Sequence, residues 1–483
     1  MTSQSASVQF EDFRDGLGGL AGVAGSLVGD GAAIDGPFGR KALVYADYVA
    51  SGRAVLPVER FILEKVLPFY ANSHTEASYC GGYVTRLRRA ARAVVARNCG
   101  ADERHAVIFS GSGATSGLNR LVHLFGVAAK AASGARPVVL IGPYEHHSNI
   151  LPWRESGAEV VTLPEAPEGG PDLAALGAAL ARFSDRPTVC ALSAASNVTG
   201  IVADVAGISR LVKQAGAMMV WDYAGGGPYL PIAMCPADGV EIDAIALSPH
   251  KFIGGPGASG VLVVRRASVA TAQPTWPGGG TVRFVSRDGH DYSSSLEARE
   301  EAGTPNVLGD IRAALAFLVK EAIGEPAMAE RNDELARRAL NAWTGAEGLE
   351  LLGNLAAPRL PIFSFRIRDA AGGHVHQQLV TRLLSDRYGI QARGGCACAG
   401  PYVMQLLGIE PAEQQRLRER ILAGEEIVKP GFTRLNFSVL LSEEKVRFIL
   451  SSVAELAREA GSFRADYAVD PSSAIFSPLS MVA

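Results

Sequence analysis

The sequence predicts an α/β protein in which a mainly parallel sheet is covered by helices and is followed by a smaller α+β domain. Between Lys41 and about Asn306, short apolar runs of strand length alternate with helical patterns. Runs that are apolar throughout are typical of strands buried on both faces. After about Asn306, longer helical patterns dominate. The length of 483 residues also predicts more than one domain.

The first part contains a series of predicted buried strands with helical segments between them. The predicted strands are Val107–Phe109, Val138–Ile141, Val160–Leu163, Thr188–Leu192, Met218–Trp221, Ala244–Ala246 and Gly260–Val264. The predicted helices are Thr85–Asn98, Gly117–Phe125, Leu173–Arg182 and Val205–Ala215. This alternation indicates a parallel sheet with helices on both faces.

The C-terminal part is predicted to be a separate α+β unit. Its predicted elements are helices at Ile311–Ile323 and Pro326–Trp343, a strand at Ile362–Ile367, a helix at Val375–Tyr388, a loop at Arg393–Tyr402, a strand at Thr433–Phe437 and a helix at Glu443–Ala460. We therefore expect a Gly-rich N-terminal arm over residues 1–40, a large domain over 41–310 and a small C-terminal domain over 311–483.

Composition argues for an ordinary soluble globular protein. Hydrophobic residues make up 48% and charged residues 20% of the chain, and the formal net charge is −3. This charge gives no electrostatic reason to expect nucleic acid or an anionic membrane as a partner. The six cysteines are scattered along the chain, which favours reduced thiols and a cytoplasmic location over a disulfide framework.

The N-terminal 40 residues are Gly-rich and lack clear periodicity, so we expect a flexible or loosely packed arm. Glu11, Asp12 and Asp15 precede the apolar stretch, whereas a secretory signal would begin with basic residues. The stretch Leu17–Leu27 is broken by glycines and a serine and is too short to span a bilayer.

Lys251 is the first candidate for chemistry. It follows a predicted strand and enters a Gly-rich loop, where a lysine could form a Schiff base with pyridoxal phosphate (PLP). On its own, this lysine could equally be a surface residue in a turn. Asp222 strengthens the PLP interpretation because it ends the preceding apolar strand. PLP enzymes use an acidic partner to keep the pyridine nitrogen protonated, and open α/β sheets bind ligands at their strand ends.

Two further segments lie at predicted strand ends. The run Ser110–Gly117 is rich in glycine and hydroxyl residues and opens a predicted helix, where backbone N–H groups suit a phosphate. An ordinary turn with a helix cap is the alternative. The segment Tyr144–Asn149 contains His146, whose imidazole could lie on the face of a pyridine ring, although a single histidine is more often structural.

Taken in order, these motifs resemble the class V aminotransferase family. Within it, the chain is most similar to cysteine desulfurases of the sulfur-mobilising type, which are close to selenocysteine lyases. The resemblance runs from about Tyr45 to Ala460. It implies an aspartate-aminotransferase-like PLP fold, a PLP cofactor and an amino-acid substrate, with L-cysteine expected.

The resemblance implies a set of phosphate ligands. Ala114 and Thr115 match the phosphate-binding turn, and Ser248 and His250 match further ligands. Thr304, in Ala-Gly-Thr-Pro-Asn, matches a residue that reaches the phosphate of the neighbouring subunit. That match implies a homodimer with shared active sites.

The resemblance also implies residues around the cofactor ring. Asp47 falls in the family's opening motif, and His146 matches the stacking imidazole. Asn197 matches the amide near the phenolic oxygen, Asp222 the partner of the pyridine nitrogen, and Lys251 the Schiff-base lysine.

The C-terminal match implies the reaction. The segment Arg-Gly-Gly-Cys-Ala-Cys-Ala-Gly-Pro, which begins at Arg393, aligns Cys398 with the cysteine that takes sulfur as a persulfide. The positive charge of Arg393 could favour the thiolate, and we expect Arg393 to contribute to substrate binding. Arg434 resembles the arginine that clamps the substrate carboxylate, for which a guanidinium fork is suited. A sulfur-acceptor protein is a further expected partner.

The sequence departs from the family pattern at several positions. Gly225 replaces a glutamine after the aspartate, and Ala397 stands where the sulfur-mobilising enzymes often carry histidine. Cys396 is a second thiol two residues before Cys398, and residues 403–429 form extra sequence. That sequence could cover the active site or contact a partner. The substrate and the sulfur acceptor therefore stay open, including Cys396 as acceptor.

Other functions stay open as well. Cys396 and Cys398 could be loop thiols without chemistry, and a metal is not expected because structural zinc needs four ligands. Another PLP reaction on the same fold is possible, such as a C–S lyase, an epimerase, an aminotransferase or a molybdenum cofactor sulfurase. A sulfur-relay or scaffold protein without PLP is the alternative from another class, against which Lys251, Asp222 and His146 argue.

Overall fold

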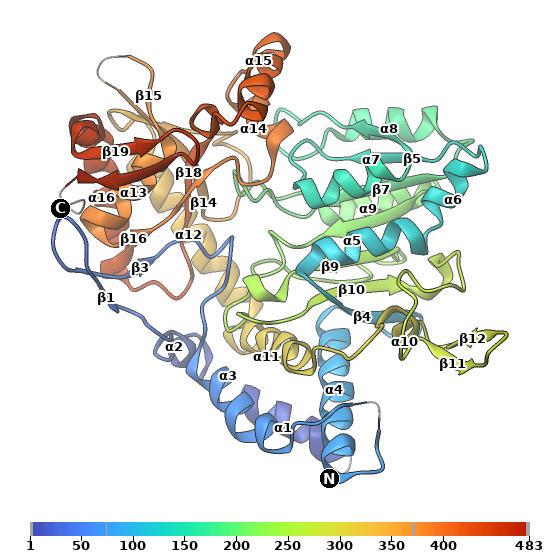
Figure 1. Cartoon of the computed structure of the whole chain (residues 1–483). Coiled ribbons are helices and arrows are strands. Elements are labelled where there is room, and N and C mark those ends of the chain that lie inside the picture. Colours follow the sequence, from blue (N-terminus) through green and yellow to red (C-terminus); the bar gives the residue numbers. More distant parts are fainter. Residues whose placement is uncertain (1–2, 74, 370–371, 480–483) are drawn as a thin grey trace. The chain divides into compact units, whose positions relative to one another are not determined.

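The computed structural model describes residues 3–73, 75–369 and 372–479 (Figure 1). These residues form two compact units. Unit 1 comprises residues 1–28, 51–195 and 203–327, and unit 2 comprises residues 29–50, 196–202 and 328–483. Among the described residues, no helix is both long and apolar enough to cross a membrane.

Unit 1 is built on a seven-stranded sheet with the strand order β4-β10-β9-β8-β7-β5-β6. The strands are β4 (His105–Gly111), β5 (Val138–Ile141), β6 (Glu159–Thr162), β7 (Thr188–Ser193), β8 (Met218–Asp222), β9 (Ala244–Leu247) and β10 (Gly260–Arg265). Strands β6, β5, β7, β8 and β9 pair in parallel, and β10 runs antiparallel between β9 and β4. The predicted mainly parallel sheet is confirmed, and each predicted strand is present.

Helices pack on the sheet and around it in unit 1 (Figure 1). They are α1 (Ser3–Asp15), α2 (Gly19–Ala24), α3 (Leu56–Phe61), α4 (Tyr79–Asn98), α5 (Gly113–Leu124), α6 (Val127–Ala132), α7 (Leu151–Glu155), α8 (Leu173–Arg182), α9 (Val205–Gln214), α10 (Leu296–Glu300) and α11 (Val307–Ile323). A hairpin of β11 (Val282–Val285) and β12 (His290–Tyr292) is added before α10. One apolar core lies between the sheet and α5, where Leu118, Leu121 and Leu262 are fully buried.

Unit 2 contains a second, smaller sheet with the order β13-β14-β18-β17 and β15 paired to β14. Its strands are β13 (Leu349–Leu351), β14 (Ile362–Arg368), β15 (His374–Val375), β17 (Arg393–Gly395) and β18 (Phe432–Asn436). Its helices are α12 (Glu325–Trp343), α13 (Gln377–Tyr388), α14 (Gly400–Leu406), α15 (Pro411–Leu422) and α16 (Glu443–Glu459). The predicted α+β character of this part is confirmed, and the extra sequence at residues 403–429 contains α15.

Three short two-stranded pairs complete unit 2. They are β1 (Ala33–Ile34) with β2 (Lys41–Ala42), β3 (Val44–Tyr45) with β16 (Ile390–Gln391), and β19 (Tyr467–Asp470) with β20 (Ile475–Pro478). The core of the unit surrounds Trp343, whose ring lies 5.4 Å from that of Phe363 and 5.6 Å from that of Phe437. These contacts hold β14 and the residue that follows β18 against α12.

The two units are divided differently from the predicted boundaries at residues 40 and 310. The expected loosely packed arm contains two helices, and Phe10 of α1 is buried with its ring stacked 5.5 Å from that of Phe61. Glycines recur from residue 16 to residue 31 but are absent from α1, so the Gly-rich composition belongs only to the part of the arm that follows this helix. Helix α11 packs against α4 in unit 1, which moves the second boundary to residue 327.

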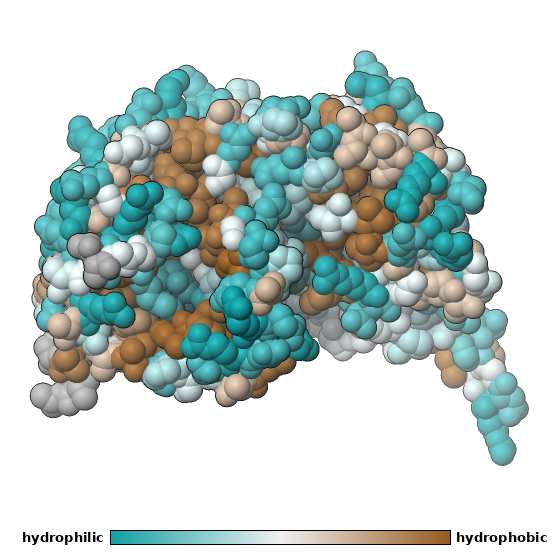
Figure 2. All heavy atoms as spheres, turned by 90° about the horizontal axis from the view of Figure 1, so that it is seen from above, coloured by the Kyte–Doolittle hydropathy of each residue, from teal (hydrophilic) through white to brown (hydrophobic). Residues whose placement is uncertain are grey.

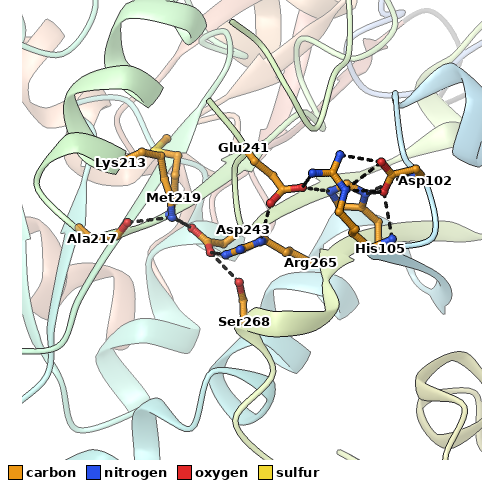
Figure 3. A network of polar contacts seen from close by, with 10 residues as sticks. Asp102, His105, Lys213, Ala217, Met219, Glu241, Asp243, Arg265 and Ser268 are labelled. Atoms are coloured by element: carbon orange, nitrogen blue, oxygen red, sulfur yellow. Dashed lines mark hydrogen bonds and ion pairs between the residues drawn. The ribbon is translucent and has the colours of Figure 1, made fainter. Parts of the chain in front are cut away.

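The amino ends of strands β4, β8 and β9 are held by a polar network (Figure 3). Asp243, which is 2% exposed, accepts hydrogen bonds from Lys213 Nζ and Ser268 Oγ, both at 2.6 Å. Glu241 pairs with Arg265 at 2.6 Å. A buried carboxylate with this many donors is compensated for its lost hydration, so the network stabilises the sheet. It lies at the end of these strands away from the candidate site.

The surface of the protein mixes polar and apolar residues. In the face shown in Figure 2, hydrophobic residues lie in several separate areas among hydrophilic ones. Scattered apolar exposure of this kind is ordinary on protein surfaces.

Candidate functional site

In unit 1, the carboxyl ends of β4 and β9 bring the predicted phosphate ligands together. The backbone N–H of Ala114, in the first turn of α5, donates to Ser248 Oγ at 2.9 Å. Gly113 has a φ of 63°, and a Cβ there would lie 2.8 Å from Ser248 Oγ and 2.8 Å from His250 Cε1. Only glycine permits this close approach. The result is a helix N-terminus flanked by a hydroxyl and an imidazole, which is a favourable place for a phosphate.

The hydroxyl of Thr115 extends the same cradle toward the segment after β5. Its Oγ1 lies 2.7 Å from Ser148 Oγ, and Ser148 Oγ lies 3.0 Å from His146 Nδ1. The backbone N–H of Ser148 also donates to His146 Nδ1 at 3.1 Å. Because Nδ1 accepts this bond, the neutral imidazole of His146 carries its proton on Nε2.

Asp222 ends β8 with its side chain only 3% exposed. Its Oδ1 accepts a hydrogen bond of 2.8 Å from the backbone N–H of Ala224. Burial raises the pKa of Asp222, and the charge of Lys251 acts against that rise. Burial removes the hydration that stabilises the charged carboxylate, and a cation placed beside it would stabilise that charge instead. Lys251 itself lies in the short 3-10 helix Pro249–Lys251, directly after β9.

These residues fit PLP. The cradle at Gly113 suits its phosphate, the buried carboxylate of Asp222 suits a protonated ring nitrogen, and Lys251 supplies an amine close enough to influence Asp222. The lysine approaches from the next strand along the sheet, since Asp222 of β8 pairs with Ala246 of β9. Thr304 is exposed in the segment before α11.

Sequence reasoning missed one buried residue of this region, Glu145. It is 2% exposed and accepts hydrogen bonds from the Ser193 backbone N–H at 2.9 Å, Ser193 Oγ at 2.6 Å and Asn149 Nδ2 at 2.7 Å. Burial raises the pKa of Glu145 to about 7. Glu145 joins the ends of β5 and β7 directly beside His146. The available signal was an acidic residue four positions after the apolar strand β5.

Glu145→Gln is expected to change how stability depends on pH. The pKa of Glu145 is raised in the folded chain from 4.5 to about 7. The stability that this group contributes is therefore fully present below 4.5 and is lost as pH rises through about 7. Glutamine does not titrate, so the wild-type unfolding free energy should fall relative to the variant by on the order of 3 kcal/mol between about pH 4.5 and 8. Urea unfolding across this range measures it; a constant difference would contradict the raised pKa.

In unit 2, Asp47 lies between two arginines. Arg434 of β18 is 3% exposed, and its guanidinium contacts Asp47 Oδ1 at 3.2 Å. Arg393 of β17 contacts Asp47 Oδ2 at 2.9 Å from a more exposed position. Arg434 also donates to the backbone carbonyl of Asn197 at 3.0 Å. A buried guanidinium fixed in this way is a ready binding group for a carboxylate.

The loop after Arg393 forms a tight turn that carries both cysteines. The backbone N–H of Ala399 donates to the carbonyl of Cys396 at 3.1 Å. The two central residues, Ala397 and Cys398, have φ values of 49° and 54°. Positive φ at both central positions is the geometry of a type I′ turn, which normally uses asparagine or glycine. The left-handed region costs a non-glycine residue about 1–2 kcal/mol, so this turn is strained.

A side-chain amide holds the strained turn in place. Asn197 Nδ2 donates to the carbonyl of Ala397 at 2.9 Å. Because Asn197 also accepts a hydrogen bond from Arg434, one residue connects the buried guanidinium with the cysteine turn. Cys398 is exposed, and Cys396 is partly exposed. The unit thus holds an accessible thiol and a carboxylate-binding group on connected segments.

Over residues 3–73, 75–369 and 372–479, no group of three or more histidine, cysteine, aspartate or glutamate side chains is placed to hold an ion. Each cysteine is a free thiol in this part of the chain.

Comparisons with known proteins agree with the geometry. A family model described as aminotransferase class-V matches residues 44–446. A probable cysteine desulfurase of Vibrio cholerae is 29% identical over 420 residues, which cover 85% of this chain and 93% of that protein. A cysteine desulfurase of Klebsiella pneumoniae is 30% identical over 364 residues, covering 74% and 85%. The apo structure of a cysteine desulfurase from Thermococcus onnurineus is similar with a TM-score of 0.71 and 26% identity, covering 86% of this chain and 95% of that one.

Proposed function

Because the chain belongs to the class-V aminotransferase family, we propose that it converts L-cysteine to L-alanine and transfers the sulfur to Cys398 as a persulfide. The family is PLP-dependent, so the cofactor is PLP. When bound, PLP supplies an electron sink that withdraws electrons from the substrate Cα. The observation that carries the proposal is the strained, exposed turn of Cys398, joined through Asn197 to the buried guanidinium of Arg434.

The residues of unit 1 are proposed to hold the cofactor. Lys251 binds it covalently through Nζ and moves the proton at the substrate Cα. Asp222 keeps the ring nitrogen protonated, and the imidazole of His146 lies on the ring. The phosphate takes the N–H of Ala114 and the side chains of Thr115, Ser248 and His250. We also propose that Asn197 contributes its amide near the phenolic oxygen.

Arg434 is proposed to bind the α-carboxylate of the substrate. Asp47 holds the same guanidinium in the described structure, so the incoming carboxylate competes with Asp47 or joins it. Arg393 also pairs with Asp47, so Asp47 would keep one cationic partner if the substrate carboxylate displaced it from Arg434. Arg393 is therefore proposed to support substrate binding through Asp47.

Arg434→Lys is expected to raise the KM for cysteine by about 10-fold to 100-fold, because hydrogen bonds to charged groups contribute about 1.5–3 kcal/mol. Lysine keeps the charge but lacks the fork that engages a carboxylate and the Asn197 carbonyl together. Steady-state kinetics of alanine formation measures the effect. Arg338→Lys is the matched control, since Arg338 pairs with Glu334 and Glu443 at the surface of the same unit. An unchanged KM in Arg434→Lys would refute the clamp.

The sulfur is proposed to leave by nucleophilic attack. The thiolate of Cys398 attacks the substrate sulfur, the bond from that sulfur to Cβ breaks, and Cβ keeps the electron pair and is protonated. Alanine and a Cys398 persulfide result. Only a thiolate is competent in this step, and a positive group such as Arg393 favours it.

The assembly and the location are proposed on the same basis. Thr304 matches a residue that contacts the neighbouring subunit's phosphate, which supports a homodimer. Thr304 is exposed before α11, so its hydroxyl is available for such a contact. A sulfur-acceptor protein would collect the persulfide from the exposed Cys398. The reduced thiols support a cytoplasmic location.

Stoichiometry of the reaction tests the proposed function. Purified enzyme with bound PLP is given L-cysteine, and alanine and sulfide are measured with and without a reductant. We expect the amount of alanine to equal the sum of released sulfide and protein-bound sulfur. Formation of pyruvate and ammonia in place of alanine would indicate a C–S lyase and overturn the proposal.

A further inference from the structure

Cys396 is a second thiol in the turn of Cys398. On the premise of the proposed function, we propose that Cys396 is a resolving thiol. It attacks the Cys398 persulfide, closes a Cys396–Cys398 disulfide and releases hydrosulfide. The chain would then release the sulfur as free sulfide whenever no acceptor protein takes the persulfide first.

The spacing places the two thiols within reach of each other. Consecutive Cα atoms are about 3.8 Å apart, so those of Cys396 and Cys398 are separated by at most about 7.6 Å. Disulfides usually join Cα atoms about 4.4–6.8 Å apart. The hydrogen bond from Ala399 to the Cys396 carbonyl bends the segment into a turn, which shortens the separation from its extended limit.

The backbone of the turn favours a change of shape. Ala397 and Cys398 both occupy the left-handed region. Return of either residue to negative φ releases about 1–2 kcal/mol. The turn is held by the Asn197 amide at Ala397 and by its own closing hydrogen bond. Since Gly394 and Gly395 precede the cysteines, the adjoining backbone adapts easily to a new geometry.

No other cysteine of the sequence lies in unit 2. In unit 1, Cys99 and Cys190 are buried, and burial raises the pKa of the Cys99 thiol to about 12. A thiol with so high a pKa is a poor nucleophile near neutral pH. Cys396, by contrast, is partly exposed and two residues from the persulfide, so its attack is intramolecular and fast relative to attack by a dilute external thiol.

The step balances without an external oxidant. The Cys396 thiolate forms a bond to Cys398 Sγ, and the bond between Cys398 Sγ and the terminal sulfur breaks. The electron pair leaves with the terminal sulfur as hydrosulfide. That sulfur is reduced, and the Cys396 sulfur is oxidised to the disulfide. A dithiol reductant is then needed to restore both thiols for the next turnover.

Single-turnover analysis of the holoenzyme tests the proposal. The PLP-loaded, full-length wild type and Cys396→Ser variant receive one equivalent of L-cysteine without reductant, are alkylated rapidly and are mapped by peptide mass. One equivalent avoids reduction of the persulfide by excess substrate. Released sulfide is measured in parallel. Cys235→Ser, which removes an exposed thiol of unit 1, is the matched control.

In the wild type and in Cys235→Ser, we expect the peptide of residues 396–398 to lose two hydrogens as a disulfide, with release of one sulfide for each alanine. In Cys396→Ser, we expect an extra sulfur to stay on Cys398 and sulfide release to be lost until a dithiol is added. The contrary result is a wild type that retains the extra sulfur on Cys398, forms no disulfide and releases as little sulfide as Cys396→Ser. That result would overturn the role of Cys396 as a resolving thiol and leave the proposed function intact. If Cys398 of the Cys396→Ser variant carries no extra sulfur, no persulfide has formed, and the proposed function itself fails.

Discussion

Lys251→Ala is expected to lower alanine formation by at least about 10³-fold, because the substitution removes both the amine that binds PLP and the base that moves the Cα proton. Proton transfer by a positioned side chain alone contributes about 10²- to 10⁴-fold. Lys251 ends the short 3-10 helix that follows β9, and its charge opposes the rise in the pKa of Asp222. PLP can still bind through its phosphate and ring contacts, so its absorbance should shift and not disappear.

Borohydride reduction of the wild type followed by peptide mapping identifies the lysine that carries PLP. The label is expected on Lys251. Lys130→Ala is the matched control, because Lys130 is a lysine of the same unit that donates only to the backbone carbonyl of Phe125 in the described contacts. Label on another lysine, or full activity in Lys251→Ala, would remove Lys251 from the site.

The large sheet could be predicted from the sequence because its strands are buried on both faces. Strands β5 and β9 are apolar along their length, and β7 is apolar between Thr188 and Ser193, so their positions follow from composition alone. The antiparallel insertion of β10 between β9 and β4 could not be predicted, since strand order is set by tertiary packing and not by the pattern of a single run. The charged, exposed hairpin of β11 and β12 carries no apolar run and was missed.

The N-terminal helices show where the pattern misleads. The glycines after residue 15 indicate flexibility, yet α1 buries Phe10 against Phe61, and α2 follows directly. Helix α1 itself contains no glycine, so the glycines after it do not lower its helix propensity, and burial of Phe10 stabilises its packing. Local sequence cannot reveal this, because the partner ring lies about fifty residues further along the chain.

Some residues of the candidate site could be predicted from the sequence, and others could not. Residues at strand ends, such as Asp222 and Lys251, could be predicted because an α/β sheet places its ligands there. The pairing of Arg434 with Asp47 spans 387 residues and has no local signal. The strain at Ala397 and Cys398 could not be predicted either, because alanine and cysteine rarely adopt a positive φ. These hidden features bear most directly on the sulfur step.

Cys398→Ser is expected to abolish the persulfide and to lower cysteine-dependent alanine formation by at least about 10³-fold, while the PLP spectrum is unchanged. Serine is nearly isosteric but cannot supply a thiolate to attack sulfur. The turn itself should survive, because its closing bond and the Asn197 contact involve only the backbone of residues 396–399. Alanine assays, absorbance and alkylation followed by peptide mapping measure the three readouts.

Cys80→Ser is the control for loss of a partly exposed thiol elsewhere, on α4 of unit 1, and should retain activity. The pair Cys398→Ser and Cys396→Ser separates the two thiols, since Cys396→Ser is expected to form alanine and keep the extra sulfur. If Cys398→Ser forms alanine at the wild-type rate, no protein thiol is needed at this position. The reaction would then resemble that of a selenocysteine lyase or a C–S lyase, and the strained turn of Cys398 would need another explanation.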